Sequence, residues 1–402
     1  MSEIKVPIEK AQVGMYLVGI DVSWMKSPFY KHRFLLSSTD MIKQLASCGV
    51  KQISVDRDKS TCSFDGEEKK PAKAPPPANR ELPPASLSKE LSHAKNLRVQ
   101  SVKQLGVMLN GAMEEGASMD VSAMASIVEE THNSTLRNAH ALINLFHLSN
   151  RYDDLATHCY GVMSLALMLG QRMDMSDDEL SMLGSASLLM DVGWSRLPTQ
   201  LLKNLVPYTE DEYAQVQTHV DLSVELLESA GVDSQIIDLV AKHHEHLDGS
   251  GYFSQYRGAD VPLMAQIMAL ADHYDSLIKG YYDSGPVIPA TALKQIYLAG
   301  QKGSHSMELI ELLIQLVGVY PVSSAVQLDT GEKGLVTQVN WRDALRPKVR
   351  IFYSKQGLNL MKPMDVDLYQ KDRSDGRKIA KVLDPSDPRQ DPQGLLGYSL
   401  EG

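Results

Sequence analysis

The residues best suited to chemistry are histidines and aspartates in the middle of the chain. Two adjacent histidines, His243 and His244, open the string HHEHLDGSGYF at residues 243–253. Imidazole and carboxylate groups bind divalent metals such as Fe, Mn or Zn. Neighbouring side chains at a helix end point about 100° apart, so both serve one site only where a cleft surrounds that end. The Gly-x-Gly turn that follows lets backbone approach a ligand closely.

The composition narrows the class of protein. The 402 residues include twelve histidines but only three scattered cysteines, too few for a disulfide framework or a cysteine zinc site. A bound metal would therefore be held by nitrogen and oxygen. The net charge of −10 argues against a surface that coats DNA or RNA. The sequence shows neither an apolar run long enough to span a membrane nor a signal peptide, which predicts a cytoplasmic protein.

The elements that must position these residues are mainly helices. Apolar residues recur at three- and four-residue spacing between residues 89 and 318, which predicts helices over 97–113, 121–146, 161–173, 213–231 and 232–246. Residues 1–63 combine strand-like runs at 5–8, 15–20, 33–36 and 51–55 with a helix over 37–49. They predict a small α+β domain, for which a packing or dimerising role without chemistry is the simplest interpretation.

Two segments of different character complete the chain. Residues 64–88 are rich in proline and charge, which predicts a semi-extended linker, although a polyproline ligand for a partner is an alternative. Residues 319–385 return to alternation, with strands expected over 323–340 and 347–354, and form a small β appendage. Residues 386–402 are expected to be a flexible tail. The fold class is thus mainly α, with a helical domain over 89–318.

The string at residues 243–253 closely resembles the HHExxDGxGYP signature of the HD-GYP family, bacterial phosphodiesterases that hydrolyse cyclic di-GMP. Four further segments resemble the family's motifs in the same order, at residues 157–162, 188–194, 216–227 and 268–277. The likeness covers about residues 135–318, and the first sixty residues resemble the uncharacterised domain that often precedes such modules. The resemblance implies an all-helical HD-type phosphohydrolase bundle.

The resemblance also implies a set of site residues. Two divalent ions (Fe, Mn or similar) would be held by His158, Asp191, His219, His243, His244 and Asp272, with Asp191 as the bridging and catalytic residue. Asp154 precedes His158 by four residues, hence on the same helix face. It stands where some members place a ligand for a third ion, and a solvated surface charge is the equal alternative. The nucleotide would be contacted by Asp248, Gly249, Gly251, Tyr252 and Lys279.

The remaining histidines match no ligand position, and a surface or core role is expected for each: His32, His93, His132, His140, His147, His246, His273 and His305. His273, beside Asp272, is also a candidate to support the ligands.

The chain departs from the family pattern at positions that matter for catalysis. Met190 replaces the histidine of the family's His-Asp doublet, and a thioether is a poor ligand for these ions. Trp194 stands where the family has a lysine that meets the phosphate, and Phe253 replaces the last proline of the signature. Basic residues are also missing at three positions, Tyr281, Ser284 and Gly285. Lys279 is the nearby cation that remains.

The expected function is a metal-dependent cyclic di-GMP phosphodiesterase that forms pGpG or GMP, with attenuated activity. The loss of one stabilising donor typically costs about a hundred- to thousandfold in rate. The alternative is a catalytically inactive module that binds cyclic di-GMP or signalling proteins. The helices between 89 and 135 offer a route to a homodimer.

Overall fold

The computed structural model describes residues 3–22, 34–36, 38–62, 82–112, 121–148, 154–202, 208–280, 287–322, 324–340, 343–370 and 374–383. The chain divides into two compact units, residues 1–81 with 169–180 and residues 82–168 with 181–402. Helices dominate the described residues, with small sheets near the two ends of the sequence, so the predicted mainly α fold is confirmed. No helix in these ranges is long and apolar enough to cross a membrane.

The N-terminal sheet is antiparallel in the order β1-β4-β2-β3. Its strands are β1 (Glu3–Pro7), β2 (Tyr16–Ile20), β3 (Phe34–Leu35) and β4 (Gln52–Asp56), with the single turn η1 (Ile8–Lys10) after β1. Helix α1 (Thr39–Ser47) begins at Ser38, whose side chain accepts a hydrogen bond from the Met41 amide. Alternate residues of β4, Ile53 and Val55, are fully buried, as expected for a sheet with one apolar face.

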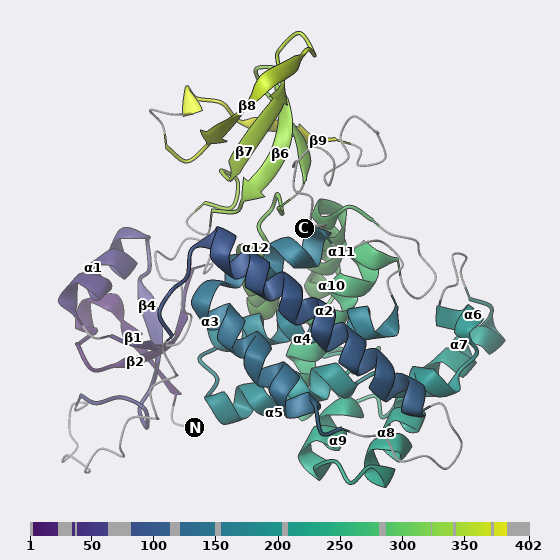
Figure 1. Ribbon diagram of the computed structural model, residues 1–402. Helices are drawn as coiled ribbons and strands as arrows, with labels where there is room; N and C mark the ends of the chain where they lie inside the picture. The colour runs from purple at the N-terminus through teal and green to yellow at the C-terminus, as the bar shows by residue number, and fades with distance from the viewer. Residues whose placement is uncertain are drawn as a thin grey trace. The chain divides into compact units, whose positions relative to one another are not determined.

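The helical part begins with two long helices, α2 (Leu87–Ala112) and α3 (Met124–Leu148), that lie side by side (Figure 1). The backbone of α3 is interrupted at Asn138, whose φ and ψ are −168° and 93°. Asn138 also donates a side-chain hydrogen bond to the Ala85 carbonyl and accepts one from the His140 amide. These bonds compete with the helical ones, so the predicted helix over 121–146 is broken.

The remaining helices carry the segments named in the sequence analysis. They are α4 (Leu155–Arg172), α5 (Asp177–Leu189), η3 (Val192–Arg196), α6 (Thr199–Leu202), α7 (Glu210–Gln217), α8 (His219–Ser229), α9 (Ser234–Val240), η4 (Gly258–Asp260), α10 (Leu263–Lys279), α11 (Pro289–Gln301) and α12 (Met307–Val317).

Two predicted helices were wrong in extent. The one over 213–231 is divided at Thr218 into α7 and α8, and the one over 232–246 ends at Val240. The adjacent histidines therefore lie in turns after α9 and not on it.

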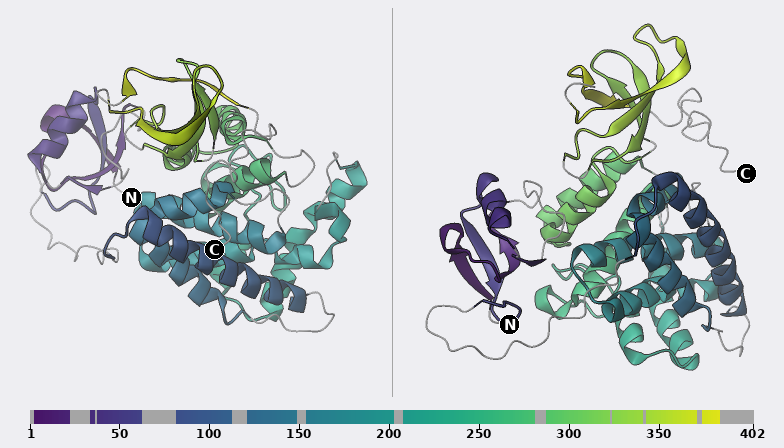
Figure 2. Two further views of the ribbon diagram at one scale, coloured as in Figure 1. Left: turned by 45° about the horizontal axis from the view of Figure 1, so that its top comes forward. Right: turned by 60° about the vertical axis from the view of Figure 1, so that its left-hand side comes forward.

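The C-terminal sheet is antiparallel in the order β8-β7-β6-β5-β9, and Figure 2 shows its strong twist. Its strands are β5 (Ala325–Leu328), β6 (Lys333–Gln338), β7 (Lys348–Tyr353), β8 (Asn359–Asp367) and β9 (Ile379–Val382). The first three match the predicted strands. The edge strands β8 and β9 were missed because few of their residues are buried, so no apolar alternation marks them.

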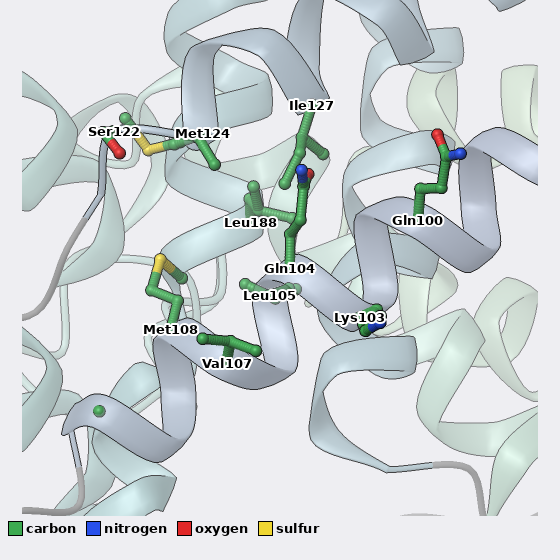
Figure 3. Close-up of a pocket in the computed structure, with 12 residues that line it drawn as sticks. Gln100, Lys103, Gln104, Leu105, Val107, Met108, Ser122, Met124, Ile127 and Leu188 are labelled. Atoms are coloured by element: carbon green, nitrogen blue, oxygen red, sulfur yellow. The ribbon is translucent and has the colours of Figure 1, made fainter.

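A cavity of about 610 Å³ opens beside α2, between its second half, the start of α3 and the end of α5 (Figure 3). Its lining is mainly apolar, with Gln100, Lys103, Gln104 and Ser122 as polar members, and includes none of the predicted site residues.

Candidate metal centre

Six of the seven predicted metal ligands lie together in the helical region. Their donor atoms form two groups, and within each group the atoms lie within 4.8 Å of one another. One group holds His158, Asp191 and Asp272; the other holds Asp191, His219, His243 and His244. Asp191 belongs to both groups, which is the position that a carboxylate needs in order to bridge two ions.

The two oxygens of Asp191 are directed to different partners. Oδ2 lies 3.2 Å from His158 Nε2, whereas Oδ1 lies 3.2 Å from His219 Nε2 and 3.6 Å from His243 Nε2. The residue lies two positions after the end of α5, just before η3, and its side chain is fully buried. The end of α5 therefore delivers one carboxylate to the middle of the cluster.

Helices α4 and α10 supply the other two members of the first group, His158 and Asp272. His158 Nε2 lies 3.2 Å from Asp272 Oδ1. The opposite ring nitrogen, Nδ1, donates to Asp275 Oδ2 at 2.6 Å, and Asp275 is fully buried. Asp275 is not among the predicted site residues, although its spacing of three residues from Asp272 places both on one face of α10. A carboxylate behind a ligand histidine fixes the ring orientation and increases its basicity.

Two histidines of the second group are oriented by backbone. His219 Nδ1 lies 2.6 Å from the Val216 carbonyl, and His243 Nδ1 lies 2.6 Å from the Val240 carbonyl. A carbonyl only accepts, so both Nδ1 atoms carry the hydrogen and both Nε2 atoms face the cluster. Since each carbonyl precedes its histidine by three residues, the local turns at the ends of α7 and α9 create this orientation.

His244 belongs to the second group and also faces Asp272 of the first. Its Nε2 is 3.2 Å from His219 Nε2, and its Nδ1 is 3.7 Å from Asp272 Oδ2. Tyr252 stacks on the His244 ring with centroids 4.5 Å apart and also meets the edge of His219. The signature tyrosine thus packs directly on two of the candidate ligands.

Glu245 holds the signature loop in place. It is buried, and its two oxygens accept hydrogen bonds from the Ser254 amide at 2.6 Å and the Tyr256 amide at 3.0 Å. Gly251 is required because a Cβ there would lie 2.4 Å from the His244 carbonyl oxygen. Phe253 has a φ of 94°, a value that the ring of proline forbids. The replacement of proline at this position therefore permits a loop conformation that proline would exclude.

Met190 and Trp194 flank Asp191. Met190 is fully buried, and its thioether is a poor ligand for borderline divalent ions. Its carbonyl accepts from the Ser223 hydroxyl at 2.9 Å, and the same hydroxyl accepts from the Gly193 amide at 2.9 Å. The Trp194 ring stacks on His219, with centroids 5.2 Å apart. The position of the family's phosphate-binding lysine is thus occupied by a buried indole that packs on a candidate ligand.

Burial and charge shift the pKa values within the first group. Burial alone would raise the pKa of Asp191, but hydrogen bonds from three surrounding imidazoles hold it well below its ordinary value. Burial alone would lower the pKa of His158, but hydrogen bonds to three carboxylates raise it well above its ordinary value. Without metal, His158 therefore favours its protonated form, and a metal ion must displace that proton.

The two adjacent histidines are shifted in opposite directions. Burial opposes the change at His243, but its hydrogen bond to Asp191 raises its pKa. Burial together with the charges of His243 and His219 lowers the pKa of His244 well below its ordinary value. His243 therefore holds a proton more strongly than an ordinary histidine, and the adjacent His244 holds one more weakly.

The other predicted site residues lie outside the two groups. Asp154 is exposed and accepts from the Thr157 amide at 2.9 Å at the start of α4. Lys279 is 3% exposed and lines a very small cavity with Arg98, on helix α10 about two turns beyond Asp272. Asp248 is exposed and accepts from Ser250. Gly249, at φ 78°, approaches the Arg257 side chain closely. His32, Tyr281, Ser284 and Gly285 lie outside the described residues.

The donor set suits borderline divalent metals. It offers four imidazole nitrogens and two carboxylates, all buried or nearly so, and no thiolate. This combination fits Fe, Mn or Zn better than Mg or Ca, which prefer oxygen alone. The sharing of Asp191 matches the requirement of a site for two ions.

Comparisons with known proteins agree with this architecture. Residues 124–304 match the family model of the HD domain, residues 3–124 that of a domain of unknown function (DUF3391), and residues 325–390 that of a KOW domain associated with HD domain. The chain therefore contains an HD domain preceded by a DUF3391 domain, and the resemblance found in the sequence is confirmed.

Three curated relatives are phosphodiesterases by name. A cyclic di-GMP phosphodiesterase of Pseudomonas aeruginosa is 26% identical over 92% of this chain and 90% of its own length. A cyclic di-GMP phosphodiesterase response regulator of Xanthomonas campestris is 29% identical over 51% of this chain and 54% of its own length. A 3'3'-cGAMP-specific phosphodiesterase of Vibrio cholerae is 30% identical over 41% of this chain and 32% of its own length. The chain thus spans only about half the length of the Xanthomonas relative and about a third of the length of the Vibrio relative.

Proposed function

We propose that this protein is a metal-dependent cyclic di-GMP phosphodiesterase of bacterial second-messenger signalling, attenuated by Met190, with pGpG or GMP as product. The observation that carries the proposal is Asp191, which is fully buried and shared between two groups of metal donors. The relative that matches over most of both chains bears the same activity in its name. The chain's departures from the family motif support the attenuation.

The two donor groups divide the proposed ligands. His158, Asp191 and Asp272 would hold one divalent ion, and Asp191 with His219, His243 and His244 would hold the other. Two such ions would supply an acidified water and offset the charge on the phosphoryl oxygens. Asp154 is retained as a candidate ligand for a third ion, because it lies one turn before His158, immediately ahead of α4.

The protein's own groups would orient these ligands and exclude water. Asp275 holds the His158 ring through Nδ1, and the Val216 and Val240 carbonyls hold two further rings. Tyr252 covers one side of His244. Because the loop from Asp248 to Tyr252 is anchored beside the ligands, we propose that it contacts the nucleotide. The proposed phosphate contact by Lys279 would require that buried side chain to emerge.

An alternative function follows from Met190 and Trp194. A missing donor and a missing cation weaken transition-state stabilisation more than they weaken ground-state binding. A chain that binds cyclic di-GMP without turnover would need the metal-bound scaffold, whereas a module that serves signalling proteins would need neither bound metal nor nucleotide. A homodimer, a cytoplasmic location and the absence of nucleic-acid polymer partners remain part of the proposal.

The domain limits are also proposed from the sequence. They comprise an α+β domain over 1–63, a linker over 64–88, the helical domain over 89–318 with its motif core at 135–318, a β appendage over 319–385 and a tail over 386–402.

The test compares the unaltered chain with Met190→His and Asp191→Asn after loading with Mn²⁺ or Fe²⁺. The formation of pGpG and GMP from cyclic di-GMP is followed by chromatography, with 3'3'-cGAMP as a second substrate. We expect slow turnover by the unaltered chain and an increase of roughly a hundred- to a thousandfold in Met190→His, since one donor is restored.

Asp191→Asn should be inactive. If the unaltered chain and Asp191→Asn show equal rates, hydrolysis at the centre that contains Asp191 is excluded. Calorimetry with cyclic di-GMP then separates the two alternatives, because only a nucleotide-binding module would release heat.

A further inference from the structure

A row of aromatic rings leads from the candidate metal centre to the protein surface. Tyr252 stacks on His244 with ring centroids 4.5 Å apart. Tyr213, on α7, meets Tyr252 in an edge-to-face contact, with centroids 6.5 Å apart and 74° between the ring planes. We propose that Tyr213 determines specificity for nucleotides, because its ring stacks on one base of the cyclic dinucleotide. This inference rests on the proposed function of the metal centre and adds a base-binding residue to it.

The position of Tyr213 is fixed by the packing of α7. The helix begins with a capping box. Val216, three residues after Tyr213, is buried in one apolar cluster with Trp194. The Val216 carbonyl accepts the Nδ1 hydrogen of His219. The short helix that orients a candidate metal ligand therefore also carries Tyr213.

The exposure of these aromatic rings differs. Tyr213 is 48% exposed, whereas Trp194, which stacks on His219, is 4% exposed. Tyr252 is half-buried, and one of its faces is covered by His244. An edge-to-face contact uses at most one face of a ring, so Tyr252 leaves at least one face of Tyr213 uncovered. Among these rings, Tyr213 therefore offers the most open surface to a planar ligand.

The charges on α7 indicate which part of a nucleotide lies there. The first turn of the helix consists of Glu210, Asp211 and Glu212, and the helix contains no basic residue. Carboxylates repel a phosphate group. A nucleobase is uncharged and flat, so it suits the Tyr213 ring, whereas the phosphate is better placed at the metal centre.

The distance between Tyr213 and the metal centre suits a nucleotide. One ribose joins the base of a nucleotide to its phosphate, and one aromatic ring, that of Tyr252, separates Tyr213 from His244. Aromatic side chains stack on every base, because every base has a π-face. Tyr213 would therefore select nucleotides over other phosphate esters without distinguishing guanine from adenine.

The experiment measures by calorimetry how GMP and ribose 5-phosphate bind to the Mn²⁺-loaded chain. The two ligands share a phosphate and a ribose, but only GMP carries a base. Neither has a phosphodiester bond, so no turnover disturbs the measurement. The variants are Tyr213→Ala, Tyr213→Phe, which keeps the ring, and Tyr297→Ala, which removes a tyrosine of similar exposure (40%) from α11.

We expect Tyr213→Ala to weaken GMP binding by about 5- to 150-fold, as is typical for the loss of one stacked base. Its affinity for ribose 5-phosphate should be unchanged. Tyr213→Phe and Tyr297→Ala should bind both ligands as the unaltered chain does. With cyclic di-GMP as substrate, Tyr213→Ala should raise KM and leave kcat nearly constant, because the base is stacked in the ground state and the transition state alike.

Equal affinities of the unaltered chain and Tyr213→Ala for GMP would overturn the stacking role and leave the proposed function untouched. An equal loss of affinity for ribose 5-phosphate would also overturn it, since the substitution would then have disturbed the phosphate-binding centre. If the unaltered chain binds neither ligand, the inference is overturned, and the hydrolysis assay alone decides the proposed function. Because the comparison requires no turnover, it decides the role of Tyr213 even where hydrolysis fails.

Discussion

Asp275 illustrates how much of this site depends on residues that touch no metal. Its carboxylate accepts the Nδ1 hydrogen of His158 at 2.6 Å, and both side chains are fully buried. The bond leaves Nε2 directed to Asp191 and Asp272. Glu245 and Ser223 act in the same way on the signature loop and on the backbone around Asp191. Each converts a flexible side chain or loop into a fixed donor.

Asp275→Asn tests this role directly. The amide keeps a similar shape but removes the negative charge behind His158, so we expect metal affinity to fall by about 10–100-fold. Competition with a chromophoric chelator measures the affinity. Asp238→Asn is the matched control, because that carboxylate is 57% exposed and pairs with Lys242 on the surface. Equal affinities in the two variants would show that Asp275 does not position the ligand.

At the level of elements, the close approach of η3 to α8 brings Asp191 to His219. A Cβ on Gly193 would lie 2.1 Å from the His219 carbonyl oxygen and 2.6 Å from the Ser223 amide nitrogen. These are backbone atoms within α8, so they cannot move aside separately. The absence of a side chain at one residue therefore sets the distance between two donor-carrying elements.

Gly193→Ala should push η3 away from α8. We expect a loss of about 1–3 kcal/mol in the free energy of unfolding, or more, together with weaker metal binding. Gly106→Ala is the control, since no atom lies within 4 Å of a Cβ on this helical residue. That variant should gain about 0.5–1 kcal/mol from the better helix former. Urea unfolding measures both changes, and equal stability of the two variants would refute the packing argument.

The molecule as a whole is acidic, so the positive charge that attracts an anionic nucleotide must come from groups or ions at the site itself. The chain carries a net charge of −10, and its proposed substrate is an anion. Lys279, the cation expected near the phosphates, is buried. Bound divalent ions would therefore provide the main attraction for the nucleotide, and removal of metal should abolish its binding.

The stability of the folded molecule should also depend on a histidine outside the candidate metal centre. His147 Nδ1 donates to the Ile143 carbonyl, and Nε2 accepts from the Tyr274 hydroxyl at 2.9 Å. Burial lowers its pKa from 6.5 to about 4. Below pH 6.5 the unfolded chain binds a proton at this histidine, whereas the folded chain does not bind it until about pH 4. The free energy of unfolding therefore decreases as the pH is lowered from 6.5 to about 4.

This contribution amounts to about 2 kcal/mol between pH 7 and pH 5. His147→Gln should lose correspondingly less stability than the parent over that interval, whereas the exposed control His93→Gln should follow the parent. Urea unfolding at the two pH values measures the difference. The raised pKa values of His158 and His243 increase the stability of the folded chain as the pH falls, which opposes the effect of His147. The test therefore compares the pH dependence of the variants with that of the parent. An unchanged pH dependence in His147→Gln would reject the argument.

Local patterns were sufficient to predict the fold class and most elements. Helical periodicity marked the long helices, alternation marked the inner strands, and the order of the motifs named the six donors that the structure brings together. The errors occur where side chains compete with the backbone, as at Asn138 and Thr218, or where few residues are buried, as in β8. Those local signals contradict or lack the periodicity on which the prediction rests.

Only the tertiary structure decided how these donors are arranged. The sequence determined that imidazoles and carboxylates, not thiolates, would carry the chemistry, and that Met190 breaks the doublet. It could not show that the two oxygens of Asp191 face different histidines, that Asp275 holds His158, or that Lys279 is buried. The physical reason is distance along the chain: each contact joins segments tens of residues apart, and packing, not local propensity, brings them together.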